Sequence, residues 1–153
     1  MRCLELKVPP PYVWFAHLLL MLLLNVIIQP MPLTALLRWL MAFVFAVAGG
    51  CIIFIAFRAF RVAATTGSPK NPAASSTLVN TGIFAISRNP VYLGMLLVML
   101  AICLALNNLF GLIAPLLFTL YITRFQIIPE ERALDKVFGD EFVVYRQKVR
   151  RWI

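Results

Sequence analysis

Four long apolar runs, separated by short polar segments, set the fold of this chain. They cover residues 12–28, 33–57, 91–106 and 109–128. The hydrocarbon core of a bilayer needs about 20 consecutive apolar residues per helix, and these runs come close to that length. We therefore predict an all-α integral membrane protein with about four transmembrane helices, followed by amphipathic helices in the C-terminal tail.

The composition argues against a soluble globular domain. Hydrophobic residues make up 62% of the chain and charged residues only 13%, whereas about a quarter of a soluble domain is charged. A net charge of +8 would suggest nucleic acid in a soluble protein. Here the basic residues flank apolar runs, where they hold helix ends against anionic lipid headgroups. We expect membrane lipids as partners and no nucleic acid.

Neither the cysteines nor the histidine indicates a metal site. The three cysteines lie far apart and form no CxxC pair. His17 lies inside an apolar run, where packing between helices is the expected role. We therefore expect no metal.

The charged residues gather on one side of the predicted helices. Most lie in the loop 58–90 and in the tail 129–153, while the opposite turns, "QPMP" and "NN", carry none. Loops rich in Lys and Arg stay in the cytoplasm. We predict a single membrane domain, residues 1–153, with both termini cytoplasmic, in the inner or plasma membrane of a prokaryote. Arg38 is expected to anchor its helix at the outer interface.

A tight hairpin should bring the polar residues together. Only Asn107 and Asn108 separate the third and fourth runs, so the two helices should lie antiparallel and adjacent. The third begins at "SRNPVYLG" and the fourth ends just before "PEE". We expect these ends to face each other across a pocket at the membrane interface. The polar residues expected there are Arg88, Asn89, Tyr92, Arg124, Gln126, Glu130 and Glu131.

The chemistry of this pocket suits a ligand with an anionic part, a flat part and a cationic or polyol part. A helix N-terminus beside Arg88 favours a carboxylate or phosphate. Tyr92 offers a ring face, and Gly94 would let a bulky group approach. The acidic pair could accept hydrogen bonds from ribose hydroxyls or an ammonium group. Nucleotide-like cofactors and S-adenosylmethionine both fit.

Structural roles compete with these assignments. Arg88 could be an anchor that extends toward the headgroups. Asn89 and Pro90 also suit the N-cap and first turn of a helix. Gly94 could serve close helix–helix contact.

The tail pattern predicts two short helices. Pro129 suits the start of the first, with Glu130 and Glu131 in its first turn, and Gly139 suits its end. A second helix, about residues 140–151, mixes apolar and basic residues and is expected to lie on the membrane surface.

The segments "GIFAISRNPVYLGMLL" and "PEERALDKVFGDEFVVYRQKVRRWI" resemble the isoprenylcysteine carboxyl methyltransferase and phospholipid methyltransferase family of integral membrane enzymes. The family pattern is a Gly, then Arg-His-Pro-x-Tyr-x-Gly at a helix mouth, a Glu-Glu pair, and a Phe-Gly-x-x-(Phe/Tyr)-x-x-Tyr tail. The resemblance covers residues 78–153. The sequence departs from it at Asn89, which stands in place of His and can form hydrogen bonds but cannot titrate.

The resemblance implies methyl transfer from S-adenosylmethionine to a lipid-like or isoprenoid acceptor at the cytoplasmic membrane face. The acceptor would enter sideways between helices, and either carboxylate O-methylation or amine N-methylation is open. The cofactor would contact Arg88, Asn89, Pro90, Tyr92, Gly94, Glu130 and Glu131. Glu131 would take the proton from an amine, and Arg146 or Arg124 would hold a carboxylate.

Two alternatives remain from the sequence. Steroid-reductase-like proteins look similar in their C-terminal half, so an NADPH-dependent membrane reductase fits the same tail. A non-enzymatic membrane subunit would need the charges only to set its topology.

Overall fold

The computed structural model describes residues 5–27, 29–64 and 76–153, and the regular structure in these ranges is helical. The apolar part of the chain forms α1 (Pro10–Leu24), α2 (Ala35–Val62), α3 (Pro90–Leu106) and α4 (Ile113–Ile122). Short connecting turns are η3 (Gly82–Ala85), η4 (Leu109–Leu112) and the π-turn η5 (Thr123–Ile127). The C-terminal tail forms α5 (Ile128–Phe138) and α6 (Asp140–Lys148).

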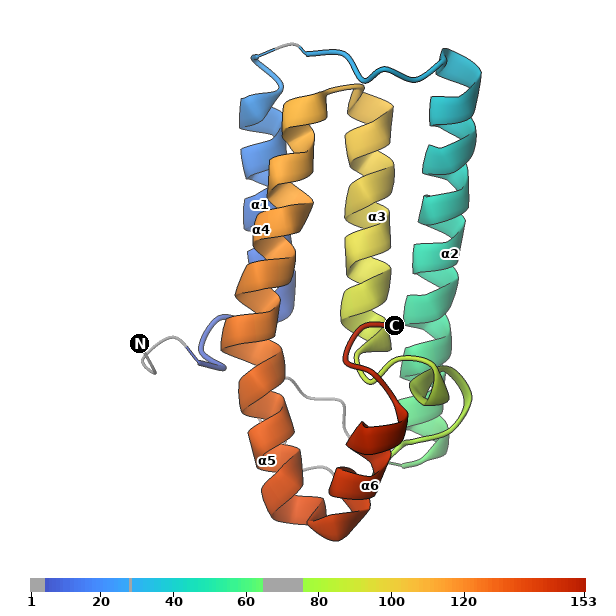
Figure 1. Cartoon of the computed structure of the whole chain (residues 1–153), viewed down its shortest axis with the longest axis vertical. Helices are drawn as coiled ribbons and strands as arrows, with labels where there is room; N and C mark the ends of the chain where they lie inside the picture. Colours follow the sequence, from blue (N-terminus) through green and yellow to red (C-terminus); the bar gives the residue numbers. More distant parts are fainter. Residues whose placement is uncertain (1–4, 28, 65–75) are drawn as a thin grey trace.

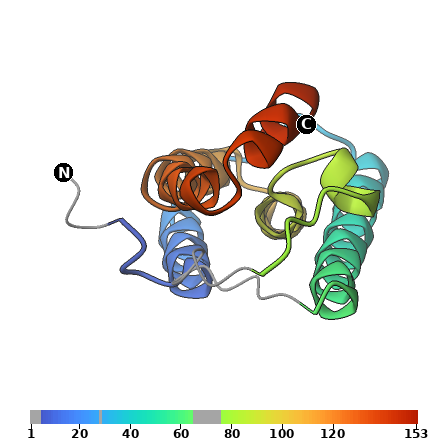
Figure 2. The same ribbon diagram turned by 90° about the horizontal axis from the view of Figure 1, so that it is seen from below.

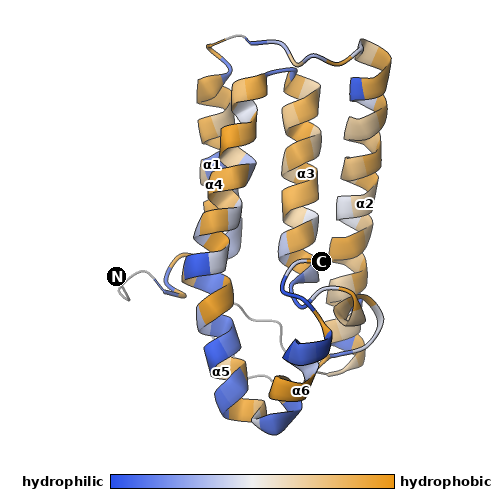
Figure 3. Cartoon of the chain, in the orientation of Figure 1, coloured by the Kyte–Doolittle hydropathy of each residue, from blue (hydrophilic) through white to orange (hydrophobic). Residues whose placement is uncertain are grey.

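The long helices run side by side, and α3 lies between the α1–α4 pair and α2 (Figures 1 and 2). Apolar residues cover α1 to α4, whereas polar residues gather on α5 and α6 (Figure 3). In the described chain, two helices are long and apolar enough to cross a membrane, Ala35–Val62 and the continuous stretch Leu109–Phe138. The apolar helices α1 and α3 are shorter, with 15 and 17 residues. Four crossings therefore stay a prediction.

The turn between α3 and η4 confirms the predicted helical hairpin. Asn107 ends α3 in the left-handed conformation, with φ of 53°, which Asn adopts more readily than most residues. Asn108 is buried, and its side-chain amide donates to the carbonyl oxygens of Leu24 and Ile27. These bonds hold the end of α1 against the hairpin, which explains why α1 ends at Leu24 rather than at the predicted residue 28.

Arg38 has a more specific role than the predicted interface anchor. Its Nη1 atom lies 2.9 Å from the carbonyl oxygen of Leu104 and 3.0 Å from that of Ala105. The last carbonyls of a helix have no partner within the helix. The Arg38 guanidinium therefore caps the C-terminus of α3 and holds α2 against it.

Helices α2 and α3 meet closely at Gly49 and Gly94. A Cβ atom at Gly94 would lie 2.7 Å from the carbonyl oxygen of Gly49 and 2.5 Å from Ile53 Cγ1. A Cβ atom at Gly49 would meet the Gly94 carbonyl oxygen at 2.7 Å. Paired small residues of this kind let helix backbones approach in membranes. Gly94 therefore fixes the position of α3 on α2.

The fourth helix does not stop before Pro129, as the sequence suggested, but continues through the π-turn into α5. Proline has no N–H to donate to the carbonyl four residues earlier, which is that of Phe125. The Phe125 carbonyl instead accepts a 3.1 Å hydrogen bond from the Leu6 backbone N–H. The π-turn absorbs the missing bond, so the helix bends without ending and carries the acidic pair away from the apolar layer.

The tail helices pack on the protein itself. Gly139 ends α5 with φ of 52°, and Glu130 and Glu131 lie in the first turn of α5, as predicted. Phe142 is 1% exposed, and with Tyr145 and Val149 it forms a small core against Leu78, Leu134 and Phe138. The position of this helix on the membrane surface stays a prediction, but its buried apolar side chains pack against α5 and the segment before α3.

Candidate functional site

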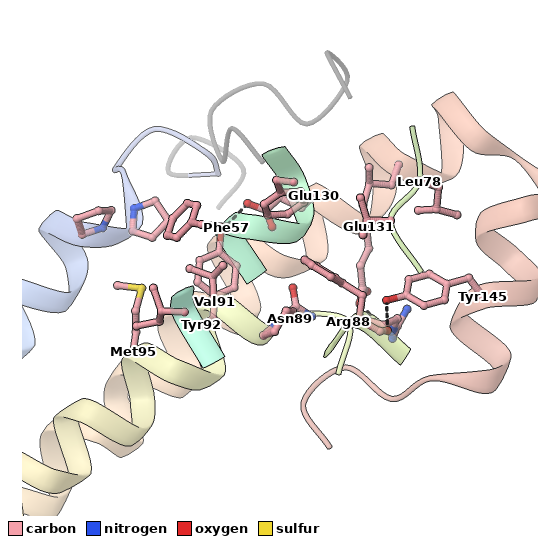
Figure 4. Close-up of a pocket in the computed structure, with 18 of the residues that line it drawn as sticks. Phe57, Leu78, Arg88, Asn89, Val91, Tyr92, Met95, Glu130, Glu131 and Tyr145 are labelled. Carbon is pink, nitrogen blue, oxygen red and sulfur yellow. Dashed lines mark hydrogen bonds and ion pairs between the residues drawn. The ribbon is translucent and has the colours of Figure 1, made fainter. Parts of the chain in front are cut away.

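A cavity of about 560 Å³ opens at the end of the bundle where α3 begins (Figure 4). Ligand pockets for small molecules span about 300–1,000 Å³, so this cavity has room for a cofactor. Its walls come from α1, α2, α3, α5 and α6, and from the segment before α3. Of the sequence-predicted residues, those that line it are Arg88, Asn89, Pro90, Tyr92, Glu130 and Glu131.

One part of the cavity is lined by apolar side chains. Its walls are Trp14 and Phe15 on α1, Phe57 on α2, and Val91 and Met95 on α3. The rings of Phe15 and Phe57 are 62% and 48% exposed. This wall is therefore formed by side chains of three different helices, two of which carry exposed rings. The indole of Trp14 donates to the Met95 carbonyl at 2.8 Å and fixes this wall.

Glu130 lies at the boundary between the apolar and polar parts. Its Oε1 atom accepts hydrogen bonds from the Tyr92 hydroxyl and from the Gln126 amide, both at 2.6 Å. Among the described residues no Lys or Arg forms an ion pair with Glu130. A partly buried carboxylate without a cation favours a positively charged ligand or a proton.

Arg88 supplies the complementary charge on the other side. Its Nη2 atom pairs with Glu131 Oε1 at 3.1 Å, and the side chain is 12% exposed. The Nε and Nη1 atoms of Arg88 are buried without a hydrogen-bond partner. Buried donors are nearly always paired in folded proteins. Because Arg88 also lines the cavity, an anionic group bound there would pair with these donors once the guanidinium turns toward it.

Glu131 is held by two arginines. Arg151 donates from Nε to Glu131 Oε1 at 3.0 Å and from Nη2 to Oε2 at 2.7 Å, and Arg88 pairs with the same carboxylate. The hydrogen bonds to Glu131 raise the pKa of Arg151. Both oxygens of Glu131 are therefore already engaged by arginine side chains.

The last residues of the chain fold back onto the beginning of α3, where Figure 1 shows the C-terminus. The Arg88 backbone N–H donates to the Arg150 carbonyl at 3.1 Å, and Asn89 Nδ2 donates to the Arg151 carbonyl at 2.9 Å. Asn89 is the N-cap residue of α3, as predicted, but its side chain makes no capping bond. The Ser87 hydroxyl accepts from the Asn89 backbone N–H instead.

Tyr145 completes the polar end of the cavity. Its hydroxyl donates to the Phe84 carbonyl at 2.6 Å, which ties α6 to the segment before α3. Burial raises the pKa of the Tyr145 phenol above its ordinary value. Tyr145 thus stays neutral and supports the wall beside Arg88.

Three sequence-predicted site residues lie away from the cavity lining. Gly94 contacts α2 and fills a packing role. Arg124 forms an ion pair with Glu5 at 3.0 Å, and Arg146 lies 3.6 Å from Asp135. Arg124 lies at the same end of the bundle as the cavity, as the predicted hairpin implies. Its side chain pairs with Glu5 of the N-terminal segment instead of the cavity.

The sequence placed Gln126 among the polar residues at the pocket but gave it no specific role, and it gave no role to Arg151. Gln126 does not line the cavity but donates to Glu130, four residues later, and that spacing was the available signal. Nothing local in the sequence marks Arg151, because its partner Glu131 lies in a separate helix.

Comparison with known proteins gives a family and one relative. A family model described as phospholipid methyltransferase matches residues 37–141. The match begins within α2, earlier than the resemblance read from the sequence, and ends early in α6. An uncharacterized protein of Haemophilus influenzae is 46% identical over 63 residues, which are 41% of this chain and 100% of that protein. No solved structure matches the chain.

Proposed function

This chain belongs to the phospholipid methyltransferase family, and we propose that the cavity at the beginning of α3 is its active site. Membership makes the protein a membrane methyltransferase that uses S-adenosylmethionine and a phospholipid-like acceptor. The observation that carries the site assignment is Arg88, whose buried Nε and Nη1 atoms have no partner. A cofactor carboxylate would satisfy them.

The charges of the cavity fit S-adenosylmethionine. Arg88 would hold the carboxylate, and Glu130, which has no cationic partner among the described residues, would attract the ammonium or sulfonium charge. Asn89, Pro90 and Tyr92 would line the cofactor at the first turn of α3. Glu131 would act through Arg88. Gly94 would not touch the cofactor but would fix the position of this turn through its contact with Gly49 on α2.

The acceptor would reach the site sideways, between α1 and α2. The cavity wall there is apolar and includes the exposed rings of Phe15 and Phe57, which suits acyl or isoprenoid chains in a bilayer. The acceptor headgroup would then lie near Glu130, at the boundary of the polar part. This arrangement keeps the chains of the acceptor in lipid while its reactive group meets the cofactor.

Bound cofactor would supply an activated methyl group for transfer to a lone pair of the acceptor, with S-adenosylhomocysteine as the leaving group. The protein contributes position and exclusion of water, and proximity alone can lower such a barrier by about 7–11 kcal/mol. An amine acceptor must also lose a proton. Glu130 is better suited to take it than Glu131, because arginine side chains already occupy both oxygens of Glu131.

For this reason we favour N-methylation of an aminophospholipid. O-methylation of an isoprenoid carboxylate is the second candidate, since the free donors of Arg88 could bind the acceptor instead of the cofactor. In either case the domain would cross the membrane four times with both termini cytoplasmic, in the inner or plasma membrane of a prokaryote. The site would then face the cytoplasm.

Methyl transfer from labelled S-adenosylmethionine tests the proposal. Detergent-solubilised protein would be given vesicles of phosphatidylethanolamine, phosphatidylcholine as a fully methylated control, or farnesylcysteine. Label in the phosphatidylethanolamine lipid, lost in Glu130→Gln, supports N-methylation at this site. Label in farnesylcysteine alone supports the second candidate. Unchanged transfer by both Glu130→Gln and Arg88→Met would remove the cavity from the reaction.

A further inference from the structure

The C-terminal segment Arg150–Trp152 lies against the beginning of α3, beside the residues that line the polar end of the cavity. Its backbone carbonyls accept hydrogen bonds from the Arg88 N–H and the Asn89 side chain. The indole N–H of Trp152 donates to the Thr123 hydroxyl at 3.3 Å. The segment is therefore fixed to the first turn of α3 and to η5 by contacts that do not involve the arginine side chains.

The Arg151 side chain pairs with Glu131, which in turn pairs with Arg88, so three charged groups lie in a row. Arg151 binds both oxygens of Glu131, at 3.0 and 2.7 Å. Glu131 has only Oε1 in contact with Arg88, through Nη2 at 3.1 Å. Arg88 is therefore oriented by one contact and keeps Nε and Nη1 without a partner.

Without Arg151, Glu131 would have only Arg88 to neutralise it. Arginine and carboxylate groups prefer to pair through two parallel hydrogen bonds, and a partly buried carboxylate gains from a second donor. Glu131 would then turn toward Arg88 and occupy a second nitrogen. The donors that would bind an anion would be lost, although both residues would remain in place.

We propose that Arg151 is a positioning residue: by occupying Glu131 it keeps the Nε and Nη1 atoms of Arg88 available for the anionic group of the cofactor. This inference rests on the proposed function, in which Arg88 binds the cofactor carboxylate. Arg151 does not itself line the cavity, so it acts through Glu131 and Arg88.

The neighbouring residue provides a matched control. Arg150 carries the same charge in the same segment, but its side chain is exposed and it contributes only its backbone carbonyl to the site. Arg150→Ala and Arg151→Ala thus remove the same charge from the same tail and differ in the contact with Glu131.

Calorimetric titration of the full-length solubilised protein with S-adenosylhomocysteine tests the proposal. We expect Arg151→Ala to raise the dissociation constant by about tenfold or more, the equivalent of one charge-assisted hydrogen bond, and Arg150→Ala to leave it unchanged. Equal affinities for Arg151→Ala and Arg150→Ala would overturn the proposal. Absence of binding by the unaltered protein would instead overturn the proposed function, and this inference with it.

A second comparison separates positioning from folding. In a Glu131→Gln background the carboxylate can no longer neutralise Arg88, so Arg151→Ala should cause no further loss of affinity. The Arg88 backbone N–H donates to the Arg150 carbonyl, so the Arg88 amide should stay protected from hydrogen exchange in Arg151→Ala, because the backbone bonds hold the segment. Loss of this protection, or an additive loss of affinity in the double variant, would show a structural role and overturn the proposal.

Discussion

The Tyr92 hydroxyl donates a 2.6 Å hydrogen bond to Glu130 Oε1 and so joins the first turn of α3 to the first turn of α5. The two residues lie on either side of the hairpin at Asn107 and Asn108. The bond fixes the partly buried carboxylate at the boundary between the apolar and polar parts of the cavity, where Figure 4 shows both side chains.

Removing this bond should impair the reaction more than the fold. Tyr92→Phe keeps the aromatic ring in the cavity wall but removes one of the two hydrogen bonds to Glu130. The bond from the Gln126 amide remains. We expect methyl transfer to fall roughly tenfold, since a hydrogen bond to a charged group contributes about 1.5–3 kcal/mol. The measurement is the initial rate of methyl transfer, with Tyr12→Phe, a change at an exposed ring, as the control. An equal rate in the two variants would contradict the role given to Tyr92.

Substitutions at the glycines of α2 and α3 can show whether Gly94 packs against α2 or contacts the cofactor. Gly94→Ala places a methyl group 2.5 Å from Ile53 Cγ1, and such overpacking typically destabilises by about 1–3 kcal/mol. Gly50→Ala, where a Cβ meets nothing within 4 Å, should be neutral or slightly stabilising because Ala favours the helix. Thermal unfolding in detergent measures both. If Gly94→Ala unfolds like the unaltered protein but no longer binds S-adenosylhomocysteine, Gly94 contacts the cofactor and the packing role is wrong.

Pro129 should be needed for the π-turn rather than for helix stability. Pro129→Ala restores an N–H that can bond to the Phe125 carbonyl, which would compete with the Leu6 bond at 3.1 Å. We expect the Leu6 amide to lose protection from hydrogen exchange and methyl transfer to fall, because Gln126 and Glu130 turn relative to Tyr92. Unchanged exchange at Leu6 together with unchanged activity would argue against this account of the turn.

The N-terminal segment should respond to acid through Glu5. The hydrogen bond from Arg124, together with Arg132, lowers the pKa of Glu5 from 4.5. A lowered folded-state pKa means that the contribution of Glu5 to stability is present above about pH 4.5 and is lost as the pH falls through the lowered value. The melting temperature should therefore exceed that of Glu5→Gln near neutral pH, and the difference should shrink on acidification. A difference independent of pH would contradict the ion pairs.

The sequence predicts the helical part and the meeting of its two polar ends because both follow from local patterns. The apolar runs predict α1 to α4, and the turn at Asn107 and Asn108 places "RNPVYLG" opposite "PEE". The structure joins these ends through Tyr92 with Glu130 and Arg88 with Glu131. Gly139 ends α5 as expected, since its φ is positive.

Other features depend on contacts between distant segments and could not be predicted. The π-turn needs Leu6 to take over the Phe125 carbonyl. The buried apolar side chains of α6 pack against Leu78 before α3 and against Leu134 and Phe138 of α5. Arg151 reaches Glu131 only because the tail turns back, which no local pattern marks.

The central claim is that the partnerless nitrogens of Arg88 bind the cofactor in this cavity. Equilibrium titration with S-adenosylhomocysteine, comparing Arg88→Met with Arg58→Met at an exposed position on α2, tests it most directly. The account predicts saturable binding by the unaltered protein and by Arg58→Met, and a loss of about tenfold or more in Arg88→Met. Equal affinity in both variants would contradict it.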